Sequence, residues 1–503
     1  MSQFLSALSR LFTDPAWRRR AVLFLCLLLL APAPLPLALA EDFRAAAAAQ
    51  AAHNYTAAAD ALSDAAARLP YVGSVVYLAG LAEISAGRYQ RAVQHLQLAA
   101  NQDGWTPDKH IALGDAYAGL GKQDAATEQW ALALKDRPTD AALLQRLAAN
   151  YEATGRYTET VAILSSLVAL GQATPEMYYR LAVLTAAASP ADALARLDVV
   201  IQIAPDHAAD ARALKSAIEQ GVHAKDEAYT LALTGFTFIQ LKEWALAEMA
   251  LTRAVTLNPN FARAYAYRGL ALDEQNQDGQ ADYETALRLE PGSPWVNYLL
   301  GNHWRRLGDS RAAINYYQKA LTLDPKNPAF AAELANTYAG LGDLTQAENW
   351  FRQAVHLAPQ DPNFWLLLAR FYCDQDYHVA EDGLPAARQA AGLAPNDAAA
   401  ADVLGCALWR TGDLVNANKS VQRALTLDPN LPSAYYHLGQ LYLKAGQTSQ
   451  AEAAFNHTLV LDPSGLYGNQ AVQALAEMTA AETPQPPAPP ASPSLASPSP
   501  ASP

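Results

Sequence analysis

Hydrophobic and small residues along most of the chain follow a helical spacing that stops and restarts at regular intervals. In residues 297–325, such side chains recur every three or four positions on both sides of a Gly-Asp break: Leu300, Gly301, Trp304, Ala313, Tyr317 and Ala320. This spacing predicts two helices joined by a tight turn at Gly308. Pro325 follows the second apolar face, and proline ends a helix because its ring clashes with the preceding turn.

The same helix-turn-helix pattern repeats at intervals close to 34 residues. From residue 259 onward it is marked by prolines spaced 32, 34, 34, 36, 34 and 34 residues apart, which are Pro259, Pro291, Pro325, Pro359, Pro395, Pro429 and Pro463. The N-terminal half has looser markers at 34-residue spacing, which are Gly80, Gly114, Ala148 and Ala182. One unit leaves an apolar face that only the next unit can bury. We therefore predict an array of about twelve helix pairs over residues 41–463.

The array contains one large irregularity. Ala182 and Gly235 occupy equivalent positions but are 53 residues apart, and the excess falls in residues 206–227. The composition of that segment predicts an extra helix ending at Gly221. We expect this helix to divide the array into two blocks, residues 41–222 and residues 223–463.

The first 40 residues have the pattern of a membrane-targeting segment. Arg18, Arg19 and Arg20 precede an uncharged stretch, residues 21–40, that ends in Ala-Leu-Ala. Two interpretations stay open: a signal peptide cleaved after Ala40, or an uncleaved membrane anchor in residues 21–40. Both place the rest of the chain on the extracytoplasmic side, in a bacterial cell envelope or secreted, because the arginines stay in the cytoplasm.

The C-terminal end changes character twice. Residues 464–482 keep a helical spacing of Val472, Leu475 and Met478, which predicts a helix that caps the last pair. Residues 483–503 consist mainly of proline, alanine and serine and carry no charge. This composition predicts a disordered, extended spacer, and a ligand for proline-binding domains is the alternative.

The best-preserved units resemble the tetratricopeptide repeat family, whose pattern combines small and aromatic residues with a closing proline. One unit carries the pattern at Tyr435, Leu438, Gly439, Tyr442, Gly446, Ala451, Phe455 and Pro463. The resemblance implies an all-α fold, a right-handed superhelical solenoid of tetratricopeptide repeats. It also implies a protein that binds other proteins or extended peptides and has no catalytic role.

The resemblance further implies that the first helix of each pair lines a concave groove. The positions that correspond to groove-lining places here are Tyr298, Asn302, Arg305, Asn336, Arg370, Trp409, Tyr436 and Gln440. Arg305 and Arg370 would suit a peptide with acidic or C-terminal carboxylate groups. The alternative is that these are ordinary solvated helix faces without a dedicated ligand.

Two cysteines, Cys373 and Cys406, fall in consecutive units on the groove side. A disulfide between them would close a loop and stabilise the fold in an oxidising compartment, provided that the two Cα atoms approach within about 7 Å. The alternative is two separate buried thiols.

Composition and motifs exclude several function classes. The net charge of −13 disfavours a nucleic-acid partner, and three cysteines in total cannot form a four-cysteine zinc or iron–sulfur site. The chain has no His-Glu-x-x-His helix, no phosphate-binding Gly-Lys-Ser/Thr loop and no Gly-x-Ser-x-Gly elbow. We therefore expect no catalytic residues, no cofactor and no metal site.

The sequence as a whole predicts a non-catalytic interaction scaffold or adaptor on the extracytoplasmic side of a membrane. Its partners would be proteins or extended peptides, and it would contact the membrane only through residues 21–40 if these are retained. The alternative is a regulatory or assembly subunit of a cell-envelope enzyme complex, with catalysis on the partner. A third class, an enzyme in its own right, has no motif to support it.

Overall fold

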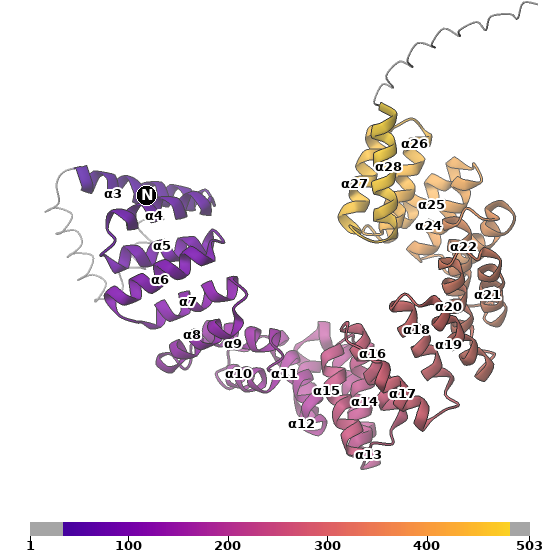
Figure 1. Cartoon of the computed structure of the whole chain (residues 1–503), viewed down its shortest axis with the longest axis horizontal. Coiled ribbons are helices and arrows are strands. Elements are labelled where there is room, and N and C mark those ends of the chain that lie inside the picture. The colour runs from indigo at the N-terminus through magenta and orange to yellow at the C-terminus, as the bar shows by residue number, and fades with distance from the viewer. Residues whose placement is uncertain (1–33, 483–503) are drawn as a thin grey trace, which may run out of the picture. The chain divides into compact units, whose positions relative to one another are not determined.

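The computed structural model describes residues 34–482, and every regular element in this range is helical. The helices form two compact units that divide between Pro259 and Asn260 (Figure 1). The predicted boundary between repeat blocks, at residues 222–223, lies inside the first unit and stays a prediction. No helix of the described range has both the length and the apolar character needed to cross a bilayer.

The first unit consists of antiparallel helix pairs and one additional helix. Its elements are α3 (Pro34–Ala51), α4 (Tyr55–Arg68), α5 (Gly73–Ser85), α6 (Tyr89–Asp103), α7 (Pro107–Gly119), α8 (Gln123–Asp136), α9 (Ala141–Ala153), α10 (Tyr157–Ala169), α11 (Pro175–Ala188), α12 (Pro190–Ile203), η1 (Pro205–His207), α13 (Ala208–Ala224), α14 (Glu227–Gln240) and α15 (Trp244–Leu257).

The second unit continues the pairs and ends in a single helix. Its elements are α16 (Ala262–Glu274), α17 (Gln280–Leu289), α18 (Pro294–Arg306), α19 (Ser310–Leu323), α20 (Pro328–Gly340), α21 (Leu344–Leu357), α22 (Pro362–Asp374), η2 (Val379–Gly383), α23 (Leu384–Leu393), α24 (Ala398–Arg410), α25 (Leu414–Leu427), α26 (Pro432–Lys444), α27 (Thr448–Leu461) and α28 (Leu466–Glu482). With the pairs of the first unit, these make the predicted twelve.

The pair α18 and α19 shows how the sequence specifies each unit. The Ser293 side chain accepts a hydrogen bond from the Val296 amide and starts α18. Gly308 adopts a φ of 82°, a left-handed conformation that a residue without Cβ reaches at no steric cost, and so allows the turn. Within the pair, Gly301 lies against the fully buried ring of Tyr317. A small residue facing an aromatic one therefore sets the close approach of the two helices.

The extra helix α13 is present, but its predicted end at Gly221 is wrong. The helix continues to Ala224 and ends at Lys225, which takes the left-handed conformation with a φ of 56°. Gly221 instead lies inside the helix, where a Cβ would come within 2.4 Å of the Thr230 backbone in α14. Here glycine allows α13 and α14 to pack closely and does not end the helix.

The terminal helices at both ends of the array pack into its core. Helix α3 includes Leu39, which packs against α4 and α5 in a core that contains Ala65 and Val76, so α3 runs through the predicted cleavage point at Ala40. At the other end, α28 packs on α26 and α27 and contributes Leu475 and Met478 to the last core cluster. The predicted targeting segment up to residue 33 and the predicted spacer from residue 483 lie outside the described residues.

Candidate functional site

The predicted groove residues all lie on first helices of the second unit, from α18 to α26. First helices pack directly on one another at α16/α18, α20/α22, α22/α24 and α24/α26. The resemblance implies that this side of the stack is concave, which stays a prediction. We call the side of the second unit formed by these helices the inner face.

The N-terminal part of the inner face contains a polar cluster around Tyr317 of α19. The Tyr317 hydroxyl donates a hydrogen bond of 2.6 Å to Asn302 Oδ1, and Arg305 Nε donates one of 3.4 Å to the same hydroxyl. Arg305 Nε also lies 3.8 Å from a Glu333 carboxylate oxygen on α20. Burial alone would lower the pKa of Arg305, but the bond to Tyr317 and nearby Glu333 raise it, so the guanidinium is charged.

A row of aromatic rings crosses α16, α18 and α20 beside this cluster. Trp295, which is 37% exposed, stacks on Tyr298 with 5.0 Å between ring centroids. Tyr267 lies 6.2 Å from Trp295, and Phe330 lies 5.1 Å from Tyr298. We call these four residues the aromatic row. Of these four, the sequence analysis predicted only Tyr298. Trp295 lies one helical turn before it, and its helical spacing places it on the same face of the helix.

Asn336 belongs to the next first helix along the inner face. Its side chain is exposed and makes no hydrogen bond within the described residues. Ala332, one turn earlier on α20, is buried. Tyr298, Asn302 and Arg305 share α18, and Arg305 lies beside Glu333, which is one turn before Asn336 on α20.

The C-terminal part of the inner face is filled by Tyr467, at the start of α28. Its hydroxyl donates a hydrogen bond of 3.4 Å to Asp374 Oδ1 on α22. Its ring lies 5.9 Å from that of Tyr436 and 5.8 Å from that of His437, both on α26. Burial raises the pKa of Asp374, with nearby His437 and Arg370 opposing the shift. The neighbourhood of Arg370 and Tyr436 is thus occupied by the chain itself.

The remaining predicted groove residues are held by intramolecular contacts. Gln440 Nε2 donates a hydrogen bond of 2.9 Å to the Tyr436 hydroxyl. Trp409 is half-buried, and the Arg410 guanidinium lies over its ring at 4.7 Å. These two residues therefore offer less free surface than Arg305 and Trp295.

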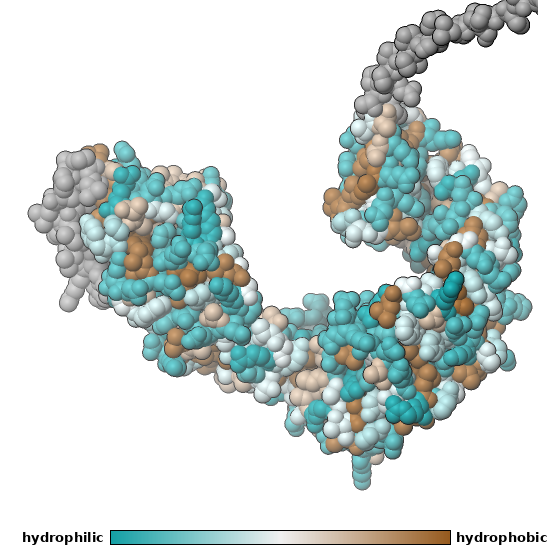
Figure 2. Space-filling model, in the orientation of Figure 1, coloured by the Kyte–Doolittle hydropathy of each residue, from teal (hydrophilic) through white to brown (hydrophobic). Residues whose placement is uncertain are grey.

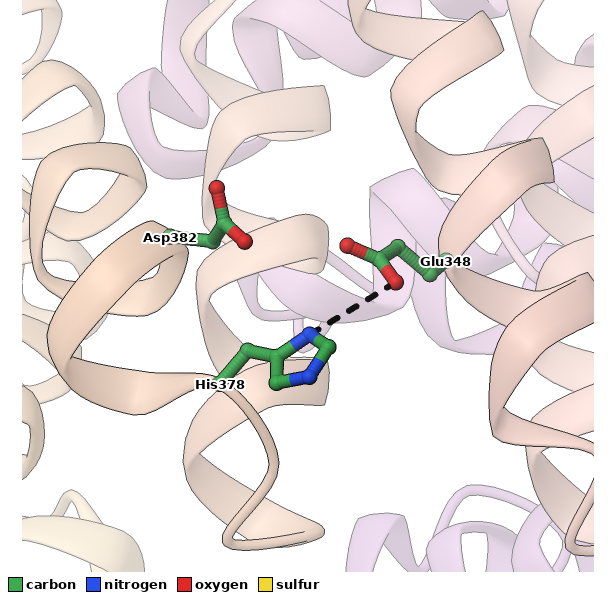
Figure 3. A group of neighbouring side chains, drawn as sticks. All are labelled: Glu348, His378 and Asp382. Carbon is green, nitrogen blue, oxygen red and sulfur yellow. Dashed lines mark ion pairs between the residues drawn. The ribbon is translucent and has the colours of Figure 1, made fainter.

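Glu348, His378 and Asp382 form a cluster that sequence reasoning missed (Figure 3). Their ligand atoms lie within 4.8 Å of one another, and carboxylate and imidazole groups are metal ligands. However, Arg352 Nη2 already lies 2.9 Å from Glu348 and 2.7 Å from Asp382. Burial alone would lower the pKa of Arg352, but the hydrogen bonds to Asp382 and Glu348 raise it. We therefore interpret the cluster as an ion-pair network that holds the η2 turn.

This interpretation makes a prediction about Arg352. Its replacement with alanine should lower the free energy of unfolding by about 1 kcal/mol, the scale of a well-formed but solvent-accessible ion-pair network. Urea denaturation followed by circular dichroism measures the loss. Zn²⁺ should not raise the thermal midpoint of the wild-type chain, because the metal would have to displace Arg352. A clear upward shift with Zn²⁺ would establish a metal site instead.

The face of the molecule shown in Figure 2 is mixed in hydropathy. Hydrophobic side chains lie in small separate patches among hydrophilic ones on the face shown in Figure 2. Recognition by such a surface needs polar anchors as well as apolar contacts. Arg305 of the polar cluster is such a polar anchor, and Trp295 of the aromatic row offers an apolar contact.

Comparison with protein families agrees with the helix-pair architecture. Residues 305–371 and 408–478 match one tetratricopeptide repeat model, and residues 273–328 match another. The fold defines an all-α solenoid of stacked helix pairs. The matched segments, all in the second unit, are tetratricopeptide repeats.

Solved structures of the same class are similar to this chain at low identity. Yeast Tom70 is 18% identical, covers 82% of this chain and 95% of its own, and has a TM-score of 0.41. A tetratricopeptide repeat protein from Parabacteroides merdae is 15% identical, with coverages of 50% and 99% and a TM-score of 0.41. TTC0263 from Thermus thermophilus is 25% identical, with coverages of 37% and 100% and a TM-score of 0.32. No curated protein matches the chain significantly.

Proposed function

We propose that the protein is a non-catalytic scaffold or adaptor that binds an extended peptide segment of a partner protein on the inner face of its second unit. The binding surface is its N-terminal part, formed by Arg305, Asn302, Asn336 and the three accessible members of the aromatic row, Tyr267, Trp295 and Tyr298. The observation that carries the proposal is the position of Arg305. Its side chain is 48% exposed, and its Nε donates a hydrogen bond to the buried Tyr317 hydroxyl. A charged group that is fixed yet accessible is suited to recognition.

The chemistry of this surface favours an acidic segment or a C-terminal carboxylate. A guanidinium presents paired N–H donors that match a carboxylate, and Arg305 has only a 3.8 Å contact with Glu333 to compete with one. Trp295 and Tyr298 offer a flat apolar surface beside it. Aromatic and arginine side chains together are the types that contribute most to binding energy at interfaces.

The proposal also includes a location outside the cytoplasm. It is supported by the arginine cluster before the uncharged residues 21–40. Sequencing the N-terminus of the protein purified from its native cells tests it. A start at Glu41 supports export with cleavage, and an intact N-terminus in the membrane fraction supports an anchor. An intact N-terminus in the cytosol contradicts both.

Substitution of Arg305 with glutamate should weaken peptide binding at least tenfold. The change replaces the guanidinium that faces the peptide carboxylates with a like charge, which costs more than 1.4 kcal/mol if the proposal holds, and each such step is about tenfold in affinity. The measurement is fluorescence anisotropy with a short labelled peptide of alternating glutamate and leucine, at low salt.

A matched control is available on the neighbouring helix. Arg311 is exposed on α19, a second helix, so Arg311→Glu makes the same charge change away from the inner face. The control should bind like the wild type. Equal losses in both variants would mean that only net charge matters, and no loss in Arg305→Glu would place the binding surface elsewhere.

A further inference from the structure

Three large apolar side chains are exposed at one end of the first two helix pairs, whose helices α3 to α6 stack in order (Figure 1). Tyr71 after α4 is 70% exposed, Leu37 at the start of α3 is 62% exposed, and Trp105 after α6 is 46% exposed. In the described part of the first unit, only Leu257 among the other large hydrophobic side chains exceeds 45%. Isolated exposed apolar side chains need no explanation, but a group at one end marks a contact surface. We call Leu37, Tyr71 and Trp105 the first-unit rim.

The start of α3 lies at the end of its pair from which Tyr71 emerges. Arg68 Nε, at the last residue of α4, donates a hydrogen bond of 2.8 Å to Asp42 Oδ2 on α3. Because the two helices are antiparallel, α3 extends past this contact toward its own N-terminus. Leu37 is five residues before Asp42, a rise of about 7 Å along the helix, and so projects from this end.

The end of α6 joins the same rim. Gln102 Nε2 donates a hydrogen bond of 2.5 Å to the carbonyl of Pro70, the residue directly before Tyr71. Trp105 follows Gln102 by three residues, and its indole ring stacks on His110 with 4.7 Å between ring centroids. The stacking holds the orientation of the Trp105 ring while a large part of the side chain stays accessible.

The rim adjoins the uncharged stretch near the N-terminus without a polar linker. No charged residue occurs between Arg20 and Glu41, and residues 34–40 of this stretch already belong to α3. Residues 21–33 alone are fewer than the roughly 20 that cross a bilayer. A short apolar segment draws its flanking residues to the membrane surface. Insertion of residues 21–33 would therefore hold the start of α3 at that surface.

The core of the first unit favours retention of this stretch. Leu39 is 2% exposed and belongs to the core cluster that also contains Leu69 and Val76. Cleavage after Ala40 would remove Leu39 from that core. The chain that keeps residues 21–40 is thus the one whose first helix pair is complete.

The chemistry of the rim suits a zwitterionic bilayer. Tryptophan and tyrosine are enriched at the level of the lipid headgroups because each has an apolar ring and a polar tip. Arg137 Nη1 near this end lies 2.8 Å from Asp108 Oδ1, so its charge is balanced within the protein. Glu41 and Asp103 add negative charge, which disfavours anionic lipids.

We propose that the first unit rests on a zwitterionic lipid bilayer through the first-unit rim, with Tyr71 and Trp105 at the level of the headgroups. The contact extends membrane binding beyond residues 21–40 to the folded array. It rests on the proposed location at a membrane with these residues retained. It is independent of peptide binding, which uses the second unit.

The test uses the full chain with Cys26→Ser and Tyr71→Cys, labelled with an NBD fluorophore and reconstituted in phosphatidylcholine vesicles. Cys373 and Cys406 are free thiols that are 1% and 2% exposed, so the label reacts with the introduced cysteine. We expect lipids with brominated acyl chains to quench the fluorophore at position 71.

A matched control position lies at the other end of the same helices. Lys122 is exposed and follows α7, whereas Trp105 precedes it, so Lys122→Cys places the label at the opposite end. Quenching at position 71 should be several-fold stronger than at position 122. Equally weak quenching at both positions in vesicle-bound protein would overturn the rim contact alone. Protein that does not associate with the vesicles would overturn the membrane location as well.

The variant Trp105→Ala, made in the labelled Tyr71→Cys chain, tests whether the rim acts together. It should weaken the quenching at position 71 at least twofold, because one of the two aromatic anchors is lost. Tyr55→Ala is the control: Tyr55 is 42% exposed and starts α4, at the opposite end from Tyr71. The control should leave the quenching unchanged, and circular dichroism checks that both variants are folded. Equal effects of the two substitutions would contradict a specific contact through the rim.

Discussion

Replacement of Asp402 with alanine is expected to destabilise the second unit by about 3–5 kcal/mol, because it leaves a buried imidazolium without its counter-charge. Asp402 and His437 are 3% and 4% exposed. Nδ1 of the His437 ring lies 2.8 Å from Oδ1 of the Asp402 carboxylate. Burial alone would lower the pKa of His437, but Asp402 and Cys406 raise it well above the usual value.

The pH dependence of this effect has a definite sign. The folded pKa of His437 is raised above its ordinary value of 6.5, so the extra stability is fully present below that value and disappears as pH rises through the folded pKa. The groups that face His437 are Asp402, Cys406, Asp374 and Tyr467, on α24, α22 and α28. The difference between wild type and Asp402→Ala should therefore be largest near pH 6 and shrink in alkaline solution.

Urea denaturation followed by circular dichroism measures both effects. Glu452→Ala, which removes an exposed carboxylate from α27, is the control and should cost little. The double variant Asp402→Asn with His437→Gln removes both charges together. Its loss of stability should therefore be smaller than the sum of the losses in Asp402→Asn alone and His437→Gln alone. A loss below 1 kcal/mol in Asp402→Ala, independent of pH, would contradict a buried ion pair.

The repeat architecture was predictable because its signals are local. Gly301 and Pro325 mark a close helix contact and a helix end within one unit, and the same markers recur through the second unit. Gly221 shows the limit of this reasoning. Glycine can end a helix, or it can allow two helices to pack closely. Only the position of Thr230 in α14 shows that Gly221 has the second role.

The candidate site was predictable only where its residues share a helix. Tyr298, Asn302 and Arg305 lie along one face of α18, so a helical repeat brings them together by itself. Tyr467 and Asp374 are 93 residues apart, and no period in the sequence relates the capping helix to α22. An aromatic residue between two glycines after the last repeat proline was the only signal available.

Substitution of Gly301 with alanine is the second change for which we expect a large effect. A Cβ at this position would lie 2.4 Å from the Tyr317 ring, far inside van der Waals contact. The ring cannot move aside cheaply, because Tyr317 is fully buried and its hydroxyl is bonded to Asn302. Overpacking of this kind costs about 2–3 kcal/mol, more than the gain of about 1 kcal/mol from the better helix propensity of alanine.

The same change should also weaken peptide binding, because a displaced Tyr317 no longer holds Arg305. Gly340→Ala is the matched control: Gly340 ends α20, and a Cβ there has no neighbour within 4 Å. The control should leave stability unchanged or raise it slightly. Urea denaturation of both variants, together with peptide anisotropy, separates packing from binding. If Gly301→Ala proved as stable as Gly340→Ala, the close contact between α18 and α19 would not limit packing in this unit.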